Sequence, residues 1–118
     1  MLIRHFAPLL FCLVCLTSTR STEAQGIITS FPSPGSEPRG LTWDGEYLWC
    51  ADAGTDSVYK LDISDGSVIS SFPFSIESIY GGITWSDDNN IWIANGSLLY
   101  KVNPANGDII SSFSCPGG

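Results

Sequence analysis

Apolar and polar residues alternate along most of this 118-residue chain, in short runs separated by turns rich in Asp, Asn, Gly and Ser. Alternation with a period of two, in runs enriched in β-branched and aromatic residues, is typical of half-buried β-strands. No helical period is long enough to predict a helix. The predicted strands are 41–44, 47–51, 58–63, 68–72, 83–86, 91–94, 98–103 and 109–113.

The same runs recur at a nearly constant interval, so the chain contains an internal repeat. The segment Ile27–Phe31 recurs at Val68–Phe72 and again at Ile109–Phe113, and both steps are 41 residues. The other matched segments are 40–43 with 82–85, 48–52 with 91–95, and 59–62 with 100–103. A period of ~40–45 residues that contains four short strands is typical of a β-propeller blade.

The predicted fold class is therefore all-β, with two four-stranded antiparallel propeller blades at 40–72 and 82–113. We expect one extra N-terminal outer strand at 27–31, so that residues 25–118 form a partial β-propeller. Closed propellers need about four to eight blades. The chain is thus expected to be either a fragment of a longer propeller, which we favour, or a short subunit that completes a ring with other copies of itself.

The first 24 residues are predicted to be a secretory signal peptide. Arg4 and His5 form a positive start, an apolar stretch follows from Phe6 to Leu16, and small residues at Thr22 and Ala24 match a cleavage site. An uncleaved anchor is the alternative, but the apolar stretch is shorter than the ~20 residues that a bilayer requires. We expect a secreted or periplasmic protein with no membrane attachment after cleavage.

The charge of the chain argues against nucleic acid as a partner. The formal net charge is −7 at pH 7, and after residue 24 the only bases are Arg39, Lys60 and Lys101. Such an acidic surface repels phosphate backbones.

The tryptophans and cysteines of the repeats are expected to be structural. We expect the four tryptophans to pack in the core; they are Trp43, Trp49, Trp85 and Trp92. Cys50 aligns with Ile93 and is expected to be buried, and nothing in its position requires a bridge to Cys115.

The first full repeat also resembles a known type of blade. The segment Gly40-Leu41-Thr42-Trp43-Asp44-Gly45-Glu46-Tyr47-Leu48-Trp49-Cys50-Ala51-Asp52, followed by Val58-Tyr59-Lys60-Leu61-Asp62, resembles the NHL-type repeat. It is equally similar to repeats of glutamine-cyclotransferase-like and quinoprotein-like propellers. The second repeat departs from the pattern, because Asn95 replaces Asp52 and the loop that follows is shorter.

The resemblance implies where a ligand would bind. In similar propellers the ligand face is built by the loop after the second strand of each blade and by the connection between blades. Carried over to this chain, the candidate ligand-face residues are Glu37, Arg39, Asp52, Asp56, Glu77 and Asn95. Arg39 could orient a carboxylate, but a surface ion pair with Glu37 is the simpler expectation.

Candidate chemistry is sparse. Asp52 and Asp56 share one loop and could hold Ca²⁺ weakly, although the further acids of a dedicated calcium loop are missing. Asp residues that cap backbone N–H groups in a turn are the favoured alternative. The only histidine is His5, inside the predicted signal peptide, so no histidine-based triad or metal site is expected after residue 24.

Three functions therefore remain open. The favoured one is an exported β-propeller segment that acts as a binding or scaffold module, with no catalysis by residues 25–118 alone and no cofactor other than Ca²⁺. The second is the N-terminal part of a propeller enzyme of glutaminyl-cyclase or lyase type. The third is a two-blade lectin that trimerises into a six-bladed ring. The expected partners are missing blades of a longer chain or other copies of the chain, with a protein or a carbohydrate as ligand.

Overall fold

A computed structural model describes residues 26–74 and 81–116 of the chain. The predicted signal peptide, residues 1–24, lies outside this range. The chain divides into two units, 1–30 and 31–118, and both propeller blades belong to the second. Among the described residues, no helix is long and apolar enough to span a membrane.

The first blade, blade one, is a four-stranded antiparallel sheet in the order β1-β2-β3-β4. Its strands are β1 (Pro38–Trp43), β2 (Leu48–Asp52), β3 (Ser57–Leu61) and β4 (Val68–Pro73). Neighbours in the chain are neighbours in the sheet, as expected for strands joined by short turns.

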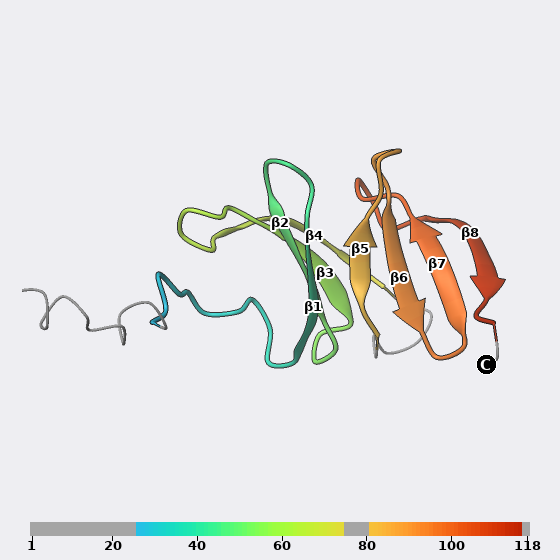
Figure 1. Ribbon diagram of the computed structural model, residues 1–118, viewed down its shortest axis with the longest axis horizontal. Coiled ribbons are helices and arrows are strands. Elements are labelled where there is room, and N and C mark those ends of the chain that lie inside the picture. The colour runs from blue at the N-terminus through green and yellow to red at the C-terminus, as the bar shows by residue number, and fades with distance from the viewer. Residues whose placement is uncertain (1–25, 75–80, 117–118) are drawn as a thin grey trace, which may run out of the picture. The chain divides into compact units, whose positions relative to one another are not determined.

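The second blade, blade two, repeats this arrangement in the order β5-β6-β7-β8. Its strands are β5 (Ile83–Trp85), β6 (Ile91–Asn95), β7 (Leu98–Val102) and β8 (Ile109–Ser114). The two sheets stand side by side, and β1 contacts β5 (Figure 1). All eight predicted strands therefore form, within one or a few residues of their expected ends, and the all-β fold of two four-stranded blades is confirmed.

The turns explain why the register of the two blades is the same. Gly66 and Gly107 both have positive φ, 77° and 82°, in the turn between the third and fourth strands of their blade. Glycine adopts this conformation without the steric cost that a side chain would add. A register shift follows at the same place in both blades, between Lys60 and Leu61 and between Lys101 and Val102.

The core lies between the two sheets. One face of blade one supplies Trp49, Ala51, Val58 and Phe72, and the facing side of blade two supplies the following buried residues: Ile83, Ile91, Ile93, Tyr100 and Val102. Side chains two positions apart along a strand point to the same side of the sheet. Period-two alternation thus builds the core directly.

The structure differs from expectation at residues 27–31, which form no strand. Ile27 and Ile28 are exposed. A strand is stable only when its backbone groups pair with a neighbour, and each sheet of this chain already has its own fourth strand, β4 or β8. The repeat in sequence therefore does not become a ninth strand here.

The tryptophans and cysteines are only partly as expected. Trp49 is buried and Trp85 packs against the core, but Trp43 is 47% exposed and Trp92 is half-buried. Cys50 is buried as predicted. Both Cys50 and Cys115 are free thiols.

Candidate functional site

Asp52 lies at the end of β2, where the first candidate ligand loop begins. Its side chain is fully buried. One carboxylate oxygen accepts a hydrogen bond from the Glu37 amide at 2.7 Å, and the other accepts bonds from the Thr55 amide at 2.8 Å and the Thr55 hydroxyl at 2.9 Å. The carboxylate therefore ties the segment before β1 to the loop after β2.

The hydrogen bonds decide the ionisation of Asp52. Burial alone would raise the pKa of this carboxyl, but the hydrogen bonds from Thr55 and Glu37 outweigh burial and hold the pKa below its ordinary value of 3.8. Asp52 is thus a stable anion at neutral pH. A general base that works near pH 7 needs a higher pKa, so Asp52 is suited to a structural role.

The neighbourhood of Asp52 is tightly packed. A Cβ placed on Gly35 would overlap the Asp52 carboxylate, so the backbone passes directly over it. The Ala53 amide donates to the Glu37 carbonyl at 2.8 Å, which closes the same pair of loops. The carboxylate has little free surface for a ligand.

Asp56 ends the same loop in a left-handed conformation, with φ of 49°. Its carbonyl accepts a hydrogen bond from the Phe74 amide at 2.8 Å. One of its carboxylate oxygens is buried and has no hydrogen-bond partner in the described part of the chain. Asp56 therefore fixes the chain after β4 through its backbone, and its side chain has spare acceptor capacity.

The pair does not complete a metal site among the described residues. No group of three or more His, Cys, Asp or Glu side chains gathers there. Dedicated Ca²⁺ sites use six to eight oxygen ligands. Asp52 and Asp56 remain the residues that could contribute to a weak calcium site, with both oxygens of Asp52 already hydrogen-bonded.

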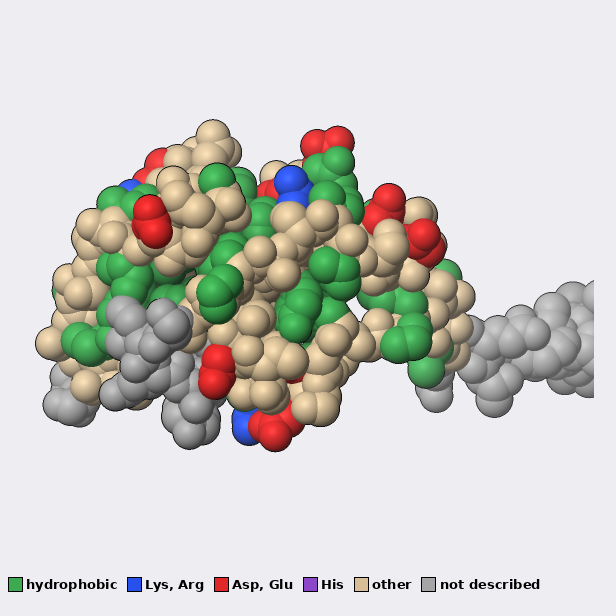
Figure 2. Space-filling view, turned by 180° about the vertical axis from the view of Figure 1, so that it is seen from behind, with side chains coloured by type: hydrophobic (Ala, Val, Ile, Leu, Met, Phe, Trp, Pro, Cys, Tyr) green, Lys and Arg blue, Asp and Glu red, His purple; other side chains and the backbone are tan. Residues whose placement is uncertain are grey.

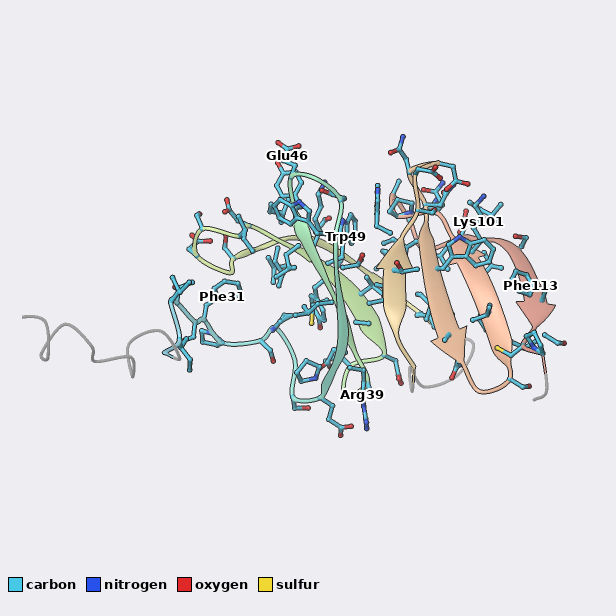
Figure 3. All side chains as sticks on the ribbon, viewed as in Figure 1. Phe31, Arg39, Glu46, Trp49, Lys101 and Phe113 are labelled. Atoms are coloured by element: carbon cyan, nitrogen blue, oxygen red, sulfur yellow. The ribbon has the colours of Figure 1, made fainter. Side chains whose placement is uncertain are left out.

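The other predicted ligand-face residues differ in their exposure and in the contacts that they make. Arg39 and Glu37 form an exposed ion pair at 3.3 Å, as the simpler expectation had it. Arg39 and Glu46 point away from the sheet at opposite ends of blade one (Figure 3). Asn95 is buried at the end of β6, at the place that Asp52 has in blade one. Glu77 lies outside the described residues.

On the face shown in Figure 2, the acids are spread out and do not form one patch. Asp88 pairs with Lys101 on blade two. The hydrogen bond from Lys101, helped by that from Ser86, lowers the pKa of Asp88 to about 2. Lys101 also lies over the ring of Trp92, 5.8 Å from its centroid.

A second candidate surface was not predicted from the sequence. It is the side of blade two that faces away from blade one, which we call the open face. The strand register places seven side chains on it: Thr84, Trp92, Ala94, Leu99, Lys101, Ser111 and Phe113. A shallow, mostly apolar pocket of about 270 Å³ lies on this face, lined by Gly82, Ile83, Thr84, Trp92, Ala94 and Leu99.

The repeat shows what is unusual about the open face. The equivalent side of blade one carries Thr42, Trp49, Ala51, Val58 and Phe72 in the same register. That side is covered by blade two, and Phe72 is only 4% exposed. Its counterpart Phe113 is 51% exposed, packs edge-on against Trp92, and projects from β8 (Figure 3). The aligned repeats contained this signal, because the side chains of the covered face of blade one recur in blade two, where no third sheet is present among the described residues.

Comparison with solved structures agrees with this geometry. A streptogramin B lyase superposes with a TM-score of 0.58 and 21% identity, over 78% of this chain and 32% of that one. Virginiamycin B lyase from Staphylococcus aureus, crystallised with quinupristin as an inactive histidine-to-alanine variant, gives a TM-score of 0.56 and 22% identity over 79% and 32%. A luciferin-regenerating enzyme gives 0.54 and 20% over 75% and 33%.

The fold is that of a partial β-propeller. At these identities the likeness establishes the fold and nothing finer. The chain spans about a third of each of these proteins.

Sequence comparison adds one relative and no family. An uncharacterised protein of Bacillus subtilis strain 168, YwhL, is 30% identical over 87 residues, which is 69% of this chain and 18% of that protein. No family model matches the chain.

Proposed function

We propose that this chain is an exported β-propeller segment that acts as a binding or scaffold module and has no catalytic activity of its own. The observation that carries the proposal is the open face. An apolar surface that is buried in blade one, at Phe72, is presented to solvent in blade two, at Phe113. Exposed apolar patches with a polar surround mark interaction surfaces.

The acidic candidates support a module without catalysis. Asp52 is held as an anion by its own loops and binds backbone groups on two sides. Arg39 is paired with Glu37. The only histidine of the chain is His5. The resemblance to NHL-type and glutamine-cyclotransferase-like blades, and export by the predicted signal peptide, are part of this proposal.

The binding surface can be tested with the apolar dye 8-anilinonaphthalene-1-sulfonate. We expect the chain to enhance dye fluorescence and Phe113→Glu to reduce that enhancement several-fold. The matched control is Ile69→Glu, which changes an exposed apolar residue of β4 away from the open face. The difference between variants is decisive, because any dye bound by the apolar stretch at 6–16 would contribute equally to both. Equal fluorescence from both variants would overturn the open face as the binding surface.

A second candidate function is the N-terminal part of a propeller lyase. It is favoured by the two lyases among the matched structures, with TM-scores of 0.58 and 0.56. The test is to incubate the chain with quinupristin and to separate quinupristin from any ring-opened isomer of the same mass by liquid chromatography before mass spectrometry. We expect no loss. Turnover that disappears in Asp52→Asn would support the lyase and contradict the non-enzymatic module.

A further inference from the structure

Each blade has two faces. At the contact between the blades, the face of blade one that carries Trp49 and Phe72 packs against the face of blade two that carries Ile83 and Tyr100. From blade one, Trp49 stacks on Trp85 of blade two, with ring centroids 6.0 Å apart. The Trp85 amide donates a hydrogen bond to the Thr42 hydroxyl at 2.8 Å. A Cβ on Gly40 would lie 2.9 Å from Ile83, so β1 and β5 approach closely. This contact shows what the open face is built to meet.

The seat of the phenylalanine completes the contact. A Cβ on Gly107 would lie 2.5 Å from the Phe72 ring, so Phe72 of blade one packs on the bare backbone of the last turn of blade two. Phe113 is the counterpart of Phe72 and has no such turn beneath it in the described residues. Among the described residues, no further Asx-Gly turn packs against the open face at this position.

The side of blade one that faces away from blade two has the residues that the open face needs. We call it the receiving face. In the same register as Ile83, Trp85, Ile91, Ile93, Tyr100 and Val102 of blade two, it carries Leu41, Trp43, Leu48, Cys50, Tyr59 and Leu61. Cys50 and Leu61 are already buried within the chain. Leu41 is 60% exposed and Trp43 is 47% exposed. Both halves of the contact are thus present on one chain, at opposite ends of the two-blade unit.

The receiving face also has a seat for phenylalanine. Gly66 lies in the turn equivalent to that of Gly107, with φ of 77°. The ring of Phe31 packs on Gly66, where a Cβ would overlap it. Phe31 is the counterpart of Phe72 and Phe113 in the repeat. The position on Gly66 is therefore already occupied by an equivalent phenylalanine of the same chain.

We propose that the open face of one chain docks on the receiving face of a second copy, head to tail, with Phe113 replacing Phe31 on Gly66. The proposal rests on the proposed function, whose binding surface it supplies with a partner. In the proposed contact, each residue of the open face meets the counterpart of the residue that it would meet in the contact between blade one and blade two. A head-to-tail contact uses two different surfaces, so it leads to rings when the rotation closes and to open chains when it does not.

The two-surface contact permits a complementation test in the full chain. Phe113→Glu removes the open face and keeps the receiving face, whereas Trp43→Glu does the reverse. Both side chains are about half exposed, so each variant should keep the β-rich circular dichroism of the parent. By sedimentation velocity, we expect the parent and Ile69→Glu to form dimers or larger species and each face variant to be monomeric. An equimolar mixture of the two face variants should form dimers only.

The outcomes separate this inference from the proposed function. A parent chain that stays monomeric, or face variants that do not combine on mixing, would overturn docking between copies. If dye enhancement is nevertheless lost in Phe113→Glu, the open face is a binding surface for another partner. If residues 1–24 alone caused association, both face variants would still associate, and that result would also overturn the proposal.

Discussion

Single residues of this chain contribute mainly by holding backbone segments together. Asp52 is the clearest case, since three donors from two loops converge on one buried carboxylate. Asp44 does the same at the first hairpin, where it accepts bonds from two backbone amides and from the Trp49 indole at 2.8 Å. Burial would raise the pKa of Asp44, but these bonds lower it.

We expect Asp52→Ala to destabilise the chain by about 3 kcal/mol, because hydrogen bonds to a buried charge are lost and their donors are left unpaired. Urea unfolding measures the change. Glu46→Gln, in an exposed turn, is the control and should change stability little. A loss below about 0.5 kcal/mol in Asp52→Ala would contradict a structural role.

The same carboxylate predicts a pH dependence. Because the folded pKa of Asp52 lies below its ordinary 3.8, its stabilising effect is complete above that value. The effect is lost as the pH falls through the folded pKa. Asp52→Asn should therefore flatten the acid limb of a plot of unfolding free energy against pH. An unchanged limb would show that other groups control acid unfolding.

Asp88 offers a direct titration. Its pKa is about 2 because Lys101 donates a hydrogen bond to it, with Ser86 adding another. In Lys101→Met we expect the carboxyl midpoint, followed by NMR, to rise towards 3.8. Lys60→Met on blade one is the matched control and should leave the midpoint of Asp88 in place. A low midpoint in Lys101→Met would contradict the ion pair.

At the scale of strands and turns, the repeat makes matched experiments available. Gly45 and Gly107 both have positive φ, but only Gly107 has another side chain, Phe72, against its Cα. We expect Gly45→Ala to cost about 1 kcal/mol for its φ alone. Gly107→Ala should cost clearly more in thermal unfolding, because Phe72 must also move. Equal losses would mean that the Phe72 seat contributes nothing.

Phe72 and Phe113 form the second matched pair. Replacing buried Phe72 with Ala should cost about 3–5 kcal/mol, as for phenylalanines in other cores. Phe113→Ala should cost far less in the isolated chain, because half of that side chain is already in water. Urea unfolding at low protein concentration compares them. A similar cost at both positions would indicate that Phe113 is already covered.

The sequence predicts those features that depend on local pattern. Period-two alternation located the eight strands. Residues 27–31 carry the same pattern without becoming a strand, because pairing depends on a free sheet edge that local sequence does not reveal. Trp43 lies in a paired strand and is exposed for a different reason, because local sequence does not reveal which side of a sheet another blade covers.

The candidate site was predicted less completely. The Arg39–Glu37 pair follows from a spacing of two residues. The engagement of Asp52 with Glu37 joins residues 15 positions apart and requires the folded sheet to be seen. The open face needed the register of β6, β7 and β8, which shows that Trp92, Leu99 and Phe113 share one side.

At the scale of the whole molecule, the two-blade unit has unlike ends. One end presents Phe113 and Trp92, and the other presents Leu41 and Trp43. If these ends meet between copies, association adds to folding stability by mass action.

Phe31 then becomes a competitor for the seat on Gly66. We expect Phe31→Ala to strengthen self-association several-fold, because Phe113 of the second copy no longer has to displace it. Sedimentation equilibrium measures the change. Pro32→Ala, at the exposed neighbouring position, is the control. Weaker association in Phe31→Ala would show that Phe31 supports the contact instead of competing with it.

The shared register of the two blades also bears on how such a chain can lengthen in evolution. A tandem duplication of one unit of 41 or 42 residues would add a blade that carries the same contact residues, since Gly40 and Thr42 of blade one recur as Gly82 and Thr84 of blade two. We therefore expect that gene segments of this length can be gained one at a time.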